Sequence, residues 1–249
     1  MSGSKRAARS GARILYVAGL GLDFPRHATL ETLGALTESD TVASNLPHRD
    51  GLMDFLALFC KDIRTLSYRG LDDEHWAERV LGMLGPGKTV TFLTFGHALV
   101  GGNLAHVLIG KAREAGIEVR CLSSISTMDE ALSLALLSFG VSITGLHVYD
   151  TRLLISGDVA LQPKVATVVY FGVSSWEGGE AEVARTVERT VALVARAYPA
   201  SHEVLLSFPP YRDRRVQRVA VGALGDALRA ISEPLIAATV LYIPPPIPS

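Results

Sequence analysis

The feature that most constrains this chain is an alternation of short apolar runs with longer segments of helical spacing. RILYVAGL (13–20), TVASNL (41–46), TVTFLTFG (89–96) and IEVRCL (117–122) are rich in β-branched and other apolar residues, as buried strands are. Between them, apolar residues recur every three or four positions, as in EHWAERVLGML (74–84). This alternation predicts an α/β fold with a mostly parallel sheet covered by helices.

The second half of the chain continues the alternation less regularly. Further predicted strands lie at 164–173, 202–208, 215–221 and 235–243. A helix is predicted at 181–198, where valines share one stripe. We expect two α/β subdomains with parallel or mixed sheets, one at 13–123 and one at 124–244. Residues 1–12 are expected to be a disordered tail, and 245–249 a short one.

Composition argues against several classes of partner. The chain has 249 residues and a formal net charge of −1, so nothing favours a nucleic-acid or acidic-lipid partner. No run approaches the roughly 18 apolar residues that span a bilayer, so no membrane segment is expected. The two cysteines, Cys60 and Cys121, suggest no disulfide framework, and the expected compartment is a reducing cytoplasm.

The stretch GMLGPGKT (82–89) has the letters of a phosphate loop, G-x-x-x-x-G-K-[ST]. A phosphate loop follows a strand and opens a helix, so that backbone N–H groups face the phosphates. Here a predicted helix precedes the motif and a predicted strand follows it. We therefore interpret 85–87 as a helix stop and a turn, and we do not expect ATP or GTP as a ligand.

Three loops follow predicted strand ends in the first half: AGLGL (18–22), FGHALVGG (95–102) and LSSIST (122–127). In an open α/β sheet, ligands bind at the carboxyl ends of the strands, so these loops are the candidate binding site. His97 lies in the second loop and is a candidate for lining it. The seven histidines show no metal-ligand spacing with cysteines or carboxylates, so no metal site is expected.

At these loops the chain resembles the tetrapyrrole methylase family, whose members use S-adenosylmethionine. The family opens with a strand and a G-x-G loop, here YVAGLGL (16–22). A glycine, a strand and a Gly-Asp-Pro loop come next, here GPGKTVTFLTFGHA (85–98). A helix, a strand, a Gly-x-Ser-Ser loop and another helix follow, here at 112–140. The order and spacing match over roughly 14–140, and the later half fits the second α/β domain of the family more loosely.

The chain departs from the family pattern in two loops. Gly-Asp-Pro is replaced by Gly96-His97-Ala98, and the glycine of Gly-x-Ser-Ser is Ser124. The histidine makes the chain more similar to the borosin branch, which methylates backbone amide nitrogens of ribosomal peptides and often carries Gly-His-Pro.

Two further segments are similar to the borosin branch, and one of its motifs is not matched. HEVLLSF (202–208) and TVLYIPPP (239–246) are similar to its closing segments. Its catalytic Arg-x-x-x-Tyr is not matched, because Asp72 and Trp76 stand near those positions.

The resemblance implies a methyltransferase that binds S-adenosylmethionine in a crevice between two subdomains, as a homodimer. Its methyl acceptor would be a peptide or a small molecule. The cofactor-binding residues that it implies are Gly19, Leu20, Gly21, Gly96, His97, Ala98, Val100, Ser126, Thr127, Phe171, Gly172, Phe208, Ala238 and Thr239.

Methyl transfer from a sulfonium needs no metal, and the protein mainly positions the two reactants. An amide nitrogen is a weak acid, so its methylation also requires a base or a polarising group. Catalytic candidates lie in the polar stretch 61–76: Tyr68, Arg69, Asp72 and His75. Alternatively, this stretch is a solvated loop in which Asp72 and Asp73 cap the following helix.

Two other functions stay open. A tetrapyrrole C-methyltransferase is disfavoured by the loss of Gly-Asp-Pro. A cofactor-binding partner without catalytic activity is compatible with Asp72 and Trp76 in place of the arginine and tyrosine.

Overall fold

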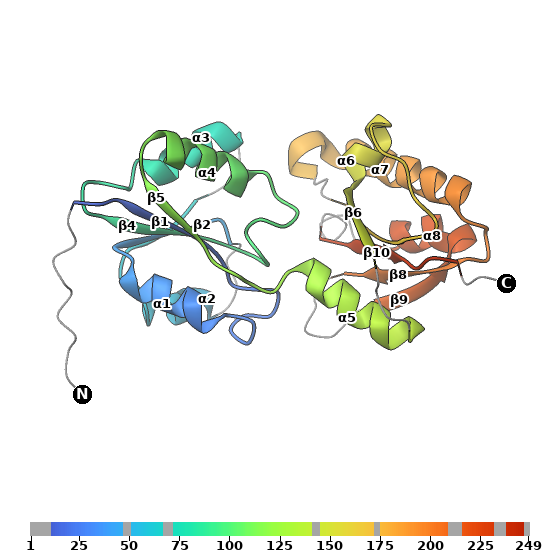
Figure 1. The fold of residues 1–249 in the computed structure, drawn as a ribbon, viewed down its shortest axis with the longest axis horizontal. Coiled ribbons are helices and arrows are strands. Elements are labelled where there is room, and N and C mark those ends of the chain that lie inside the picture. The colour runs from blue at the N-terminus through green and yellow to red at the C-terminus, as the bar shows by residue number, and fades with distance from the viewer. Residues whose placement is uncertain are drawn as a thin grey trace. The chain divides into compact units, whose positions relative to one another are not determined.

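The structure is a computed structural model that describes residues 11–46, 51–66, 72–140, 145–171, 175–208, 216–231 and 238–246, with only the backbone of 175–178 (Figure 1). The chain divides into two compact units, Met1–Ser126 and Thr127–Ser249. Each unit contains a helix-covered sheet, which confirms the predicted α/β class.

A parallel five-stranded sheet in the order β3-β2-β4-β1-β5 forms the centre of the first unit. Its strands are β1 (Ile14–Gly19), β2 (Thr41–Ser44), β3 (Ile63–Thr65), β4 (Thr89–Thr94) and β5 (Glu118–Cys121). The helices of this unit are α1 (Leu30–Glu38), α2 (Leu52–Ala57), α3 (Asp73–Leu81) and α4 (Leu104–Glu114). Figure 1 shows α1 and α2 on one face of the sheet and α3 and α4 on the other.

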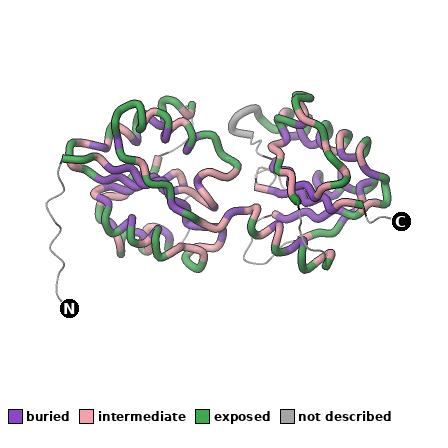
Figure 2. The backbone as a smooth tube through the Cα atoms, in the orientation of Figure 1, coloured by how far each residue is buried: buried purple, intermediate pink, exposed green. Residues whose placement is uncertain are grey.

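Strand β1 lies inside this sheet and is buried on both faces. Leu15 and Val17 belong to the core under α3 and α4, whereas Ile14, Tyr16 and Ala18 belong to the core under α1 and α2. Because successive side chains of a strand point to opposite faces, a continuous apolar run serves both cores. Figure 2 shows the buried segments following the strands of the sheet.

The second unit has a mixed five-stranded sheet in the order β6-β7-β10-β8-β9. Its strands are β6 (Leu146–Asp150), β7 (Ala166–Tyr170), β8 (Glu203–Ser207), β9 (Val216–Ala220) and β10 (Val240–Ile243). Strand β6 is parallel to β7, and the other pairs are antiparallel. The helices of this unit are α5 (Thr127–Phe139), α6 (Thr151–Ser156), α7 (Ser175–Ala197), η2 (Val221–Ala223) and α8 (Leu224–Arg229).

Helices cover both faces of this second sheet. Helices α6, α7 and α8 share one core cluster with alternate residues of the strands. Helix α5 packs on the opposite face, where the rings of Phe139 and Tyr242 lie 6.0 Å apart. The sequence pattern predicts neither β6 nor α6, nor β3 in the first unit.

Helix α3 follows the apolar stripe read from the sequence. Trp76, Ala77 and Val80 are fully buried, and the ring of Trp76 meets that of Phe92 edge to face at 5.2 Å. A charged first turn and an apolar stripe explain why this segment is an amphipathic helix against the sheet.

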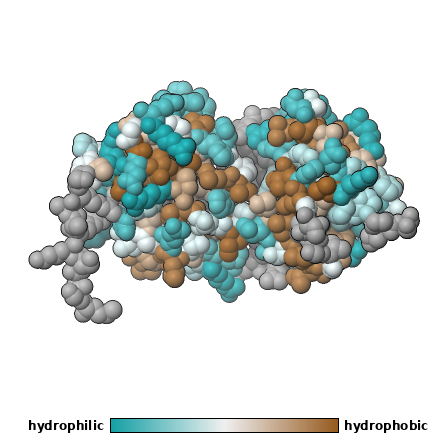
Figure 3. Space-filling model, viewed as in Figure 1, coloured by the Kyte–Doolittle hydropathy of each residue, from teal (hydrophilic) through white to brown (hydrophobic). Residues whose placement is uncertain are grey.

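Some large apolar side chains remain at the surface. They are Leu30, Leu58, Leu136, Leu137, Val148 and Leu153. Figure 3 shows apolar residues at the surface of both units, interspersed with polar ones. No helix in the described ranges is long and apolar enough to cross a membrane.

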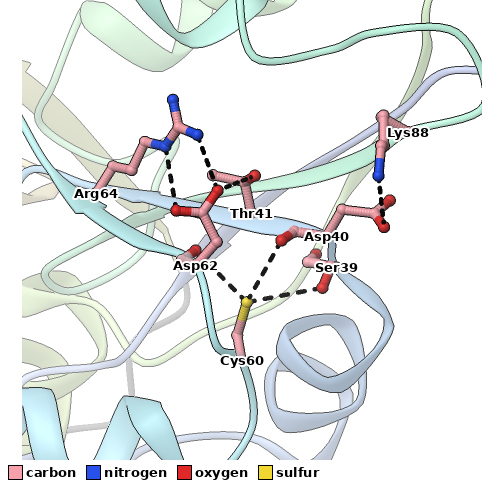
Figure 4. A network of polar contacts seen from close by, with 7 residues as sticks. All are labelled: Ser39, Asp40, Thr41, Cys60, Asp62, Arg64 and Lys88. Carbon is pink, nitrogen blue, oxygen red and sulfur yellow. Dashed lines mark hydrogen bonds and ion pairs between the residues drawn. The ribbon is translucent and has the colours of Figure 1, made fainter.

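The GMLGPGKT motif (82–89) joins the end of α3 to the start of β4, in the order that the sequence predicts. Its turn contains Gly87 at φ +70°, a conformation that favours glycine. Lys88 Nζ lies 3.3 Å from Oδ1 of Asp40 (Figure 4). The other oxygen of that carboxylate accepts a hydrogen bond from the N–H of Thr89 at 2.9 Å. The Asp40 carboxylate therefore anchors the start of β4, and the lysine of the motif pairs with that carboxylate.

A second contact network lies beside it (Figure 4). The buried thiol of Cys60 points at the carbonyl oxygens of Ser39 and Asp62, each at 3.6 Å. The Asp62 carboxylate accepts from Thr41 Oγ1 at 2.7 Å and pairs with Arg64 at 3.0 Å. Hydrogen bonding by Arg64 and then by Thr41 holds the pKa of Asp62 below its usual value. These contacts fasten the chain between α2 and β3 to the start of β2.

Because Asp40 holds the start of β4, substitutions of Asp40 and Lys88 should lower the free energy of unfolding by different amounts. Asp40→Ala leaves the Thr89 N–H without its side-chain acceptor, which costs about 1–3 kcal/mol. Lys88→Ala removes only an exposed ion pair and costs less than about 1 kcal/mol. Asp40→Asn keeps an oxygen acceptor and is expected to resemble Lys88→Ala. Urea unfolding measures all three, and an Asp40→Ala variant as stable as Lys88→Ala would contradict this account.

Candidate functional site

Two of the glycine loops are joined by their backbones. Strands β1 and β4 are parallel neighbours, so their carboxyl ends lie at one edge of the first sheet. The N–H of Gly21 donates to the oxygen of Gly96 at 3.2 Å, and the N–H of Gly96 donates to the oxygen of Gly21 at 3.0 Å. The N–H of Leu20 also donates to the oxygen of Thr94 at 3.0 Å. Residues predicted to bind the cofactor in two separate loops therefore meet.

The close approach of these loops requires glycine. A Cβ atom at Gly19 would lie 1.9 Å from the backbone oxygen of Gly96. Gly21 has φ +72°, and a Cβ there would lie 2.3 Å from Cβ of His27. Both contacts are far shorter than a carbon side chain tolerates.

The loop after β5 reaches the same place through Gly19. The hydroxyl of Ser124 donates to the carbonyl oxygen of Gly19 at 3.1 Å, and that of Thr32 donates to the same oxygen at 3.3 Å. Ser124 stands where the family pattern has a glycine, and here its side chain ties the third loop to the first. Ser126, at the end of this loop, is buried.

Two histidines close the loops by accepting backbone hydrogen bonds. Nδ1 of His27 accepts from the N–H of Leu22 at 3.3 Å and of Asp23 at 3.2 Å. Nδ1 of His97 accepts from the N–H of Leu99 at 3.1 Å. The sequence does not reveal the role of His27, because nothing in DFPRH (23–27) marks which side chain returns to the loop amides.

In the second unit, three of the predicted residues form one row. Val240 is paired with both Tyr170 and Ser207, so Thr239, Phe171 and Phe208 lie next to one another at the sheet edge. The N–H of Phe171 donates to the oxygen of Thr239 at 3.4 Å. Ala238 directly precedes this row, and Gly172 lies outside the described residues.

Thr127 begins α5 in the same unit, beside Tyr170. Burial raises the pKa of Tyr170 to about 12, the side chain of Thr127 opposes this shift, and the charge of Asp129 adds to it. The Tyr170 hydroxyl is therefore a neutral group at physiological pH.

The catalytic candidates are placed only in part. Tyr68 and Arg69 lie outside the described residues. Asp72 caps α3, and its Oδ1 accepts from the N–H of His75 at 2.9 Å and lies 2.8 Å from Nδ1 of the same residue. Asp73 accepts from the amide of Asn103 at 3.1 Å. Asp72 is thus part of a helix N-terminus, as one reading of the sequence expects.

Asp72 and His75 shift each other's ionisation. The backbone hydrogen bond from His75, and then its side-chain hydrogen bond, lower the pKa of Asp72. The hydrogen bond to Asp72, and then its charge, raise the pKa of His75. Both side chains are about two-thirds exposed to solvent. Within the ranges described, no three His, Cys, Asp or Glu residues form a group that could hold a metal ion.

Several known proteins are similar to this chain over most of its length. A family model described as Tetrapyrrole (Corrin/Porphyrin) Methylases matches residues 14–206. A methyltransferase/ribosomally synthesized type II borosin cyclic peptide precursor of Phlebiopsis gigantea is 27% identical over 202 residues. The alignment covers 75% of this chain and 35% of that protein, so the chain spans about a third of this relative's length.

Solved structures agree on the fold. A uroporphyrin-III-C-methyltransferase from Thermus thermophilus has a TM-score of 0.65 at 17% identity, covering 94% of this chain and 92% of that one. A cobalt precorrin-4 methyltransferase of cobalamin biosynthesis has a TM-score of 0.65 at 15% identity, covering 93% and 94%. The family model matches well over half of the chain and confirms the resemblance seen at the loops. The chain belongs to the tetrapyrrole methylase family, a family of methyltransferases.

Proposed function

We propose that this chain transfers the methyl group of S-adenosylmethionine to a backbone amide nitrogen of a peptide. The observation that carries the proposal is the relative from Phlebiopsis gigantea, whose name joins a methyltransferase to a ribosomally synthesized cyclic peptide precursor. The Gly-His sequence at 96–97, similar to that of the borosin branch, supports the same substrate class. A homodimer is a further expectation from the family.

The joined glycine loops support the cofactor assignment. Gly19, Gly21 and Gly96 bring the backbones of two loops together at the carboxyl ends of β1 and β4, where ligands bind in an open α/β sheet. We propose that the cofactor contacts this edge of the first unit. Thr127, Phe171, Phe208, Ala238 and Thr239 of the second unit stay cofactor-binding predictions from the family resemblance.

The proposed reaction is an in-line displacement. The amide nitrogen forms a bond to the methyl carbon while the carbon–sulfur bond breaks, and its electron pair stays on the sulfur. S-adenosylhomocysteine is released, and the amide proton must pass to a base. We propose Asp72 and His75, with Tyr68 and Arg69, as the groups that assist this proton transfer.

A tetrapyrrole acceptor is the second candidate. It is favoured by the names of the similar solved structures, a uroporphyrin and a cobalt precorrin methyltransferase. The two candidate functions differ in the molecule that accepts the methyl group. With methyl-labelled S-adenosylmethionine and an extract of the producing organism, label in peptides supports the first and label in tetrapyrroles the second.

Calorimetric titration tests the cofactor itself. We expect saturable binding of S-adenosylmethionine and no heat with ATP and magnesium, because Lys88 of the phosphate-loop-like motif pairs with Asp40. Binding of ATP alone would overturn the methyltransferase proposal. Cofactor binding without label transfer to either class of acceptor would favour a binding protein without catalytic activity.

Gly19→Ala tests the close approach of the loops. The added Cβ must displace the backbone of Gly96, so we expect a loss of stability of about 1–3 kcal/mol and strongly weakened cofactor binding. Gly34→Ala is the matched control, because nothing lies within 4 Å of its Cβ position on α1. Removing a helical glycine there stabilises by up to about 1 kcal/mol. Unfolding and calorimetry of both variants give the comparison.

Asp72→Ser separates capping from catalysis. Serine keeps an N-cap acceptor, so we expect the melting temperature to change little. The carboxylate is lost, so the raised pKa of His75 should return toward its ordinary value of 6.5 in an NMR titration. A parallel fall in methyl transfer would support a catalytic carboxylate, whereas unchanged transfer would leave Asp72 as a cap only.

The Asp72–His75 pair also predicts the pH range in which its interaction stabilises the protein. A raised pKa of His75 means that its interaction with Asp72 is complete below 6.5 and is lost as the pH rises through the raised value. A lowered pKa of Asp72 means that the interaction is present above 3.8 and is lost as the pH falls through the lowered value. The melting temperature of His75→Ala should therefore differ most from that of the unchanged protein between these two transitions.

A further inference from the structure

Helices α3 and α4 are joined by a side-chain hydrogen bond where each of them begins. The two helices lie side by side on one face of the first sheet (Figure 1). Asp73 is the first residue of α3, and Asn103 directly precedes α4. Nδ2 of Asn103 donates to Oδ2 of Asp73 at 3.1 Å. This bond connects residues that are 30 positions apart in the sequence.

Asn103 uses its side chain for the neighbouring helix instead of its own. An asparagine before a helix commonly accepts a hydrogen bond from an N–H of the first turn with its side-chain oxygen. Asn103 makes no such capping bond among the residues described, and its φ of −88° and ψ of −29° are helical. The first turn of α4 also contains no acidic residue. The contact that the side chain does make holds α3.

The hydrogen bond links two segments to which the proposed function gives different tasks. Asp73 follows Asp72, whose Oδ1 lies 2.8 Å from Nδ1 of His75 in the pair proposed to assist proton transfer. Asn103 ends the loop at 96–102, which carries several of the predicted cofactor-binding residues. Both segments belong to the first unit. A change in this contact would therefore change the distance between them.

The start of α4 is fixed in the core, whereas the first turn of α3 is not. Leu104, next to Asn103, is buried. In α3 and its cap, residues 72–75 are exposed or only partly buried, and Trp76 is the first residue that is fully buried. The bond to Asp73 therefore ties an exposed turn to a fixed point.

A second contact with α4 reaches the same turn but defines its position less well. Nζ of Lys111 lies 2.6 Å from Glu74 and 3.1 Å from Glu78. An ammonium on a flexible four-carbon stem that is shared between two carboxylates does not select one geometry. The amide of Asn103 has a short side chain and contacts Asp73 directly.

We propose that Asn103 is a positioning residue, which holds the Asp72–His75 pair at a fixed place relative to the loop at 96–102. The inference rests on the proposed function. Asn103 touches neither reactant in this account, and it acts through Asp73. Methyl transfer needs the amide nitrogen, the methyl carbon and the proton acceptor in alignment, and a misplacement of about 1 Å can cost about a hundredfold in rate.

Asn103→Ala removes the donor and tests the proposal. At saturating methyl-labelled S-adenosylmethionine, we expect the initial rate of label transfer to peptides of the extract to fall about tenfold or more. The calorimetric affinity for S-adenosylmethionine should change little, because Asn103 is not among the predicted cofactor-binding residues. The melting temperature should also change little, since the bond is exposed to solvent.

Glu78→Ala is the matched control. It removes an exposed contact of the same length, 3.1 Å, between the same two helices, one turn further along α3. We expect its rate of transfer to equal that of the unchanged protein. Because the charge of Glu78 adds to the raised pKa of His75, each variant is compared at its own optimum pH.

An exchange of the two side chains gives a sharper test. Asn103→Asp places two carboxylates opposite each other, so we expect it to slow transfer more than Asn103→Ala does. Adding Asp73→Asn exchanges donor and acceptor and restores a hydrogen bond between the helices. The rate should then recover to within about threefold of the unchanged protein, as expected for two directly coupled residues. Asp73→Asn alone leaves two amides that can still bond, so its loss should be small.

The outcomes separate this role from the proposed function. Unchanged transfer by Asn103→Ala and Asn103→Asp would overturn the positioning role. A loss in Asn103→Asp that Asp73→Asn does not reverse, or an equal loss of cofactor affinity, would overturn it too. If Asn103→Asp does not fold, Asn103→Ala against Glu78→Ala decides. Failure of the unchanged protein to label peptides would overturn the proposed function, and this role with it.

Discussion

The backbone contact between the end of β1 and the loop after β4 fixes how the loops at the carboxyl ends of the first sheet are arranged. Gly19 has no space for a side chain against Gly96, and Gly21 exchanges two hydrogen bonds with the same residue. Ser124 brings the loop after β5 to that point through the carbonyl of Gly19. Three loops, of which the first and third are 105 residues apart at Gly19 and Ser124, thereby form one edge. Backbone hydrogen bonds and the Ser124 hydroxyl together hold this edge.

The backbone N–H groups of the first loop (residues 20–23) already donate within the protein, so the two loops differ in the donors that they leave available. His27 occupies the amides of Leu22 and Asp23, whereas the amides of His97 and Ala98 stay available. The two loops resemble each other as glycine turns, yet they present different hydrogen-bonding groups to a ligand. The two loops therefore differ in which of their backbone donors are already taken within the protein.

The sequence predicted the long elements because burial leaves a clear pattern. Strand β1 is an unbroken apolar run, and α3 has a helical stripe ending at glycine, so both were found. Strands β3 and β6 are short and partly exposed, so their residues follow no hydrophobic period. Among the binding residues, glycine loops marked the first edge. The closure by His27 and the row of Thr239, Phe171 and Phe208 depend on contacts between distant segments, which one sequence does not display. The roles of these residues stay predictions.

Strand β1 supplies alternate side chains to two separate cores and ends at the glycine on which three loops converge. Removing or inserting one residue within it would turn Leu15 and Val17 toward the opposite helices. The same event would move Gly19 away from its place beside Gly96. Exchange of one apolar residue for another along β1 is therefore compatible with evolution of this fold, whereas a change in the length of the strand would disturb two cores and the loop contact at once.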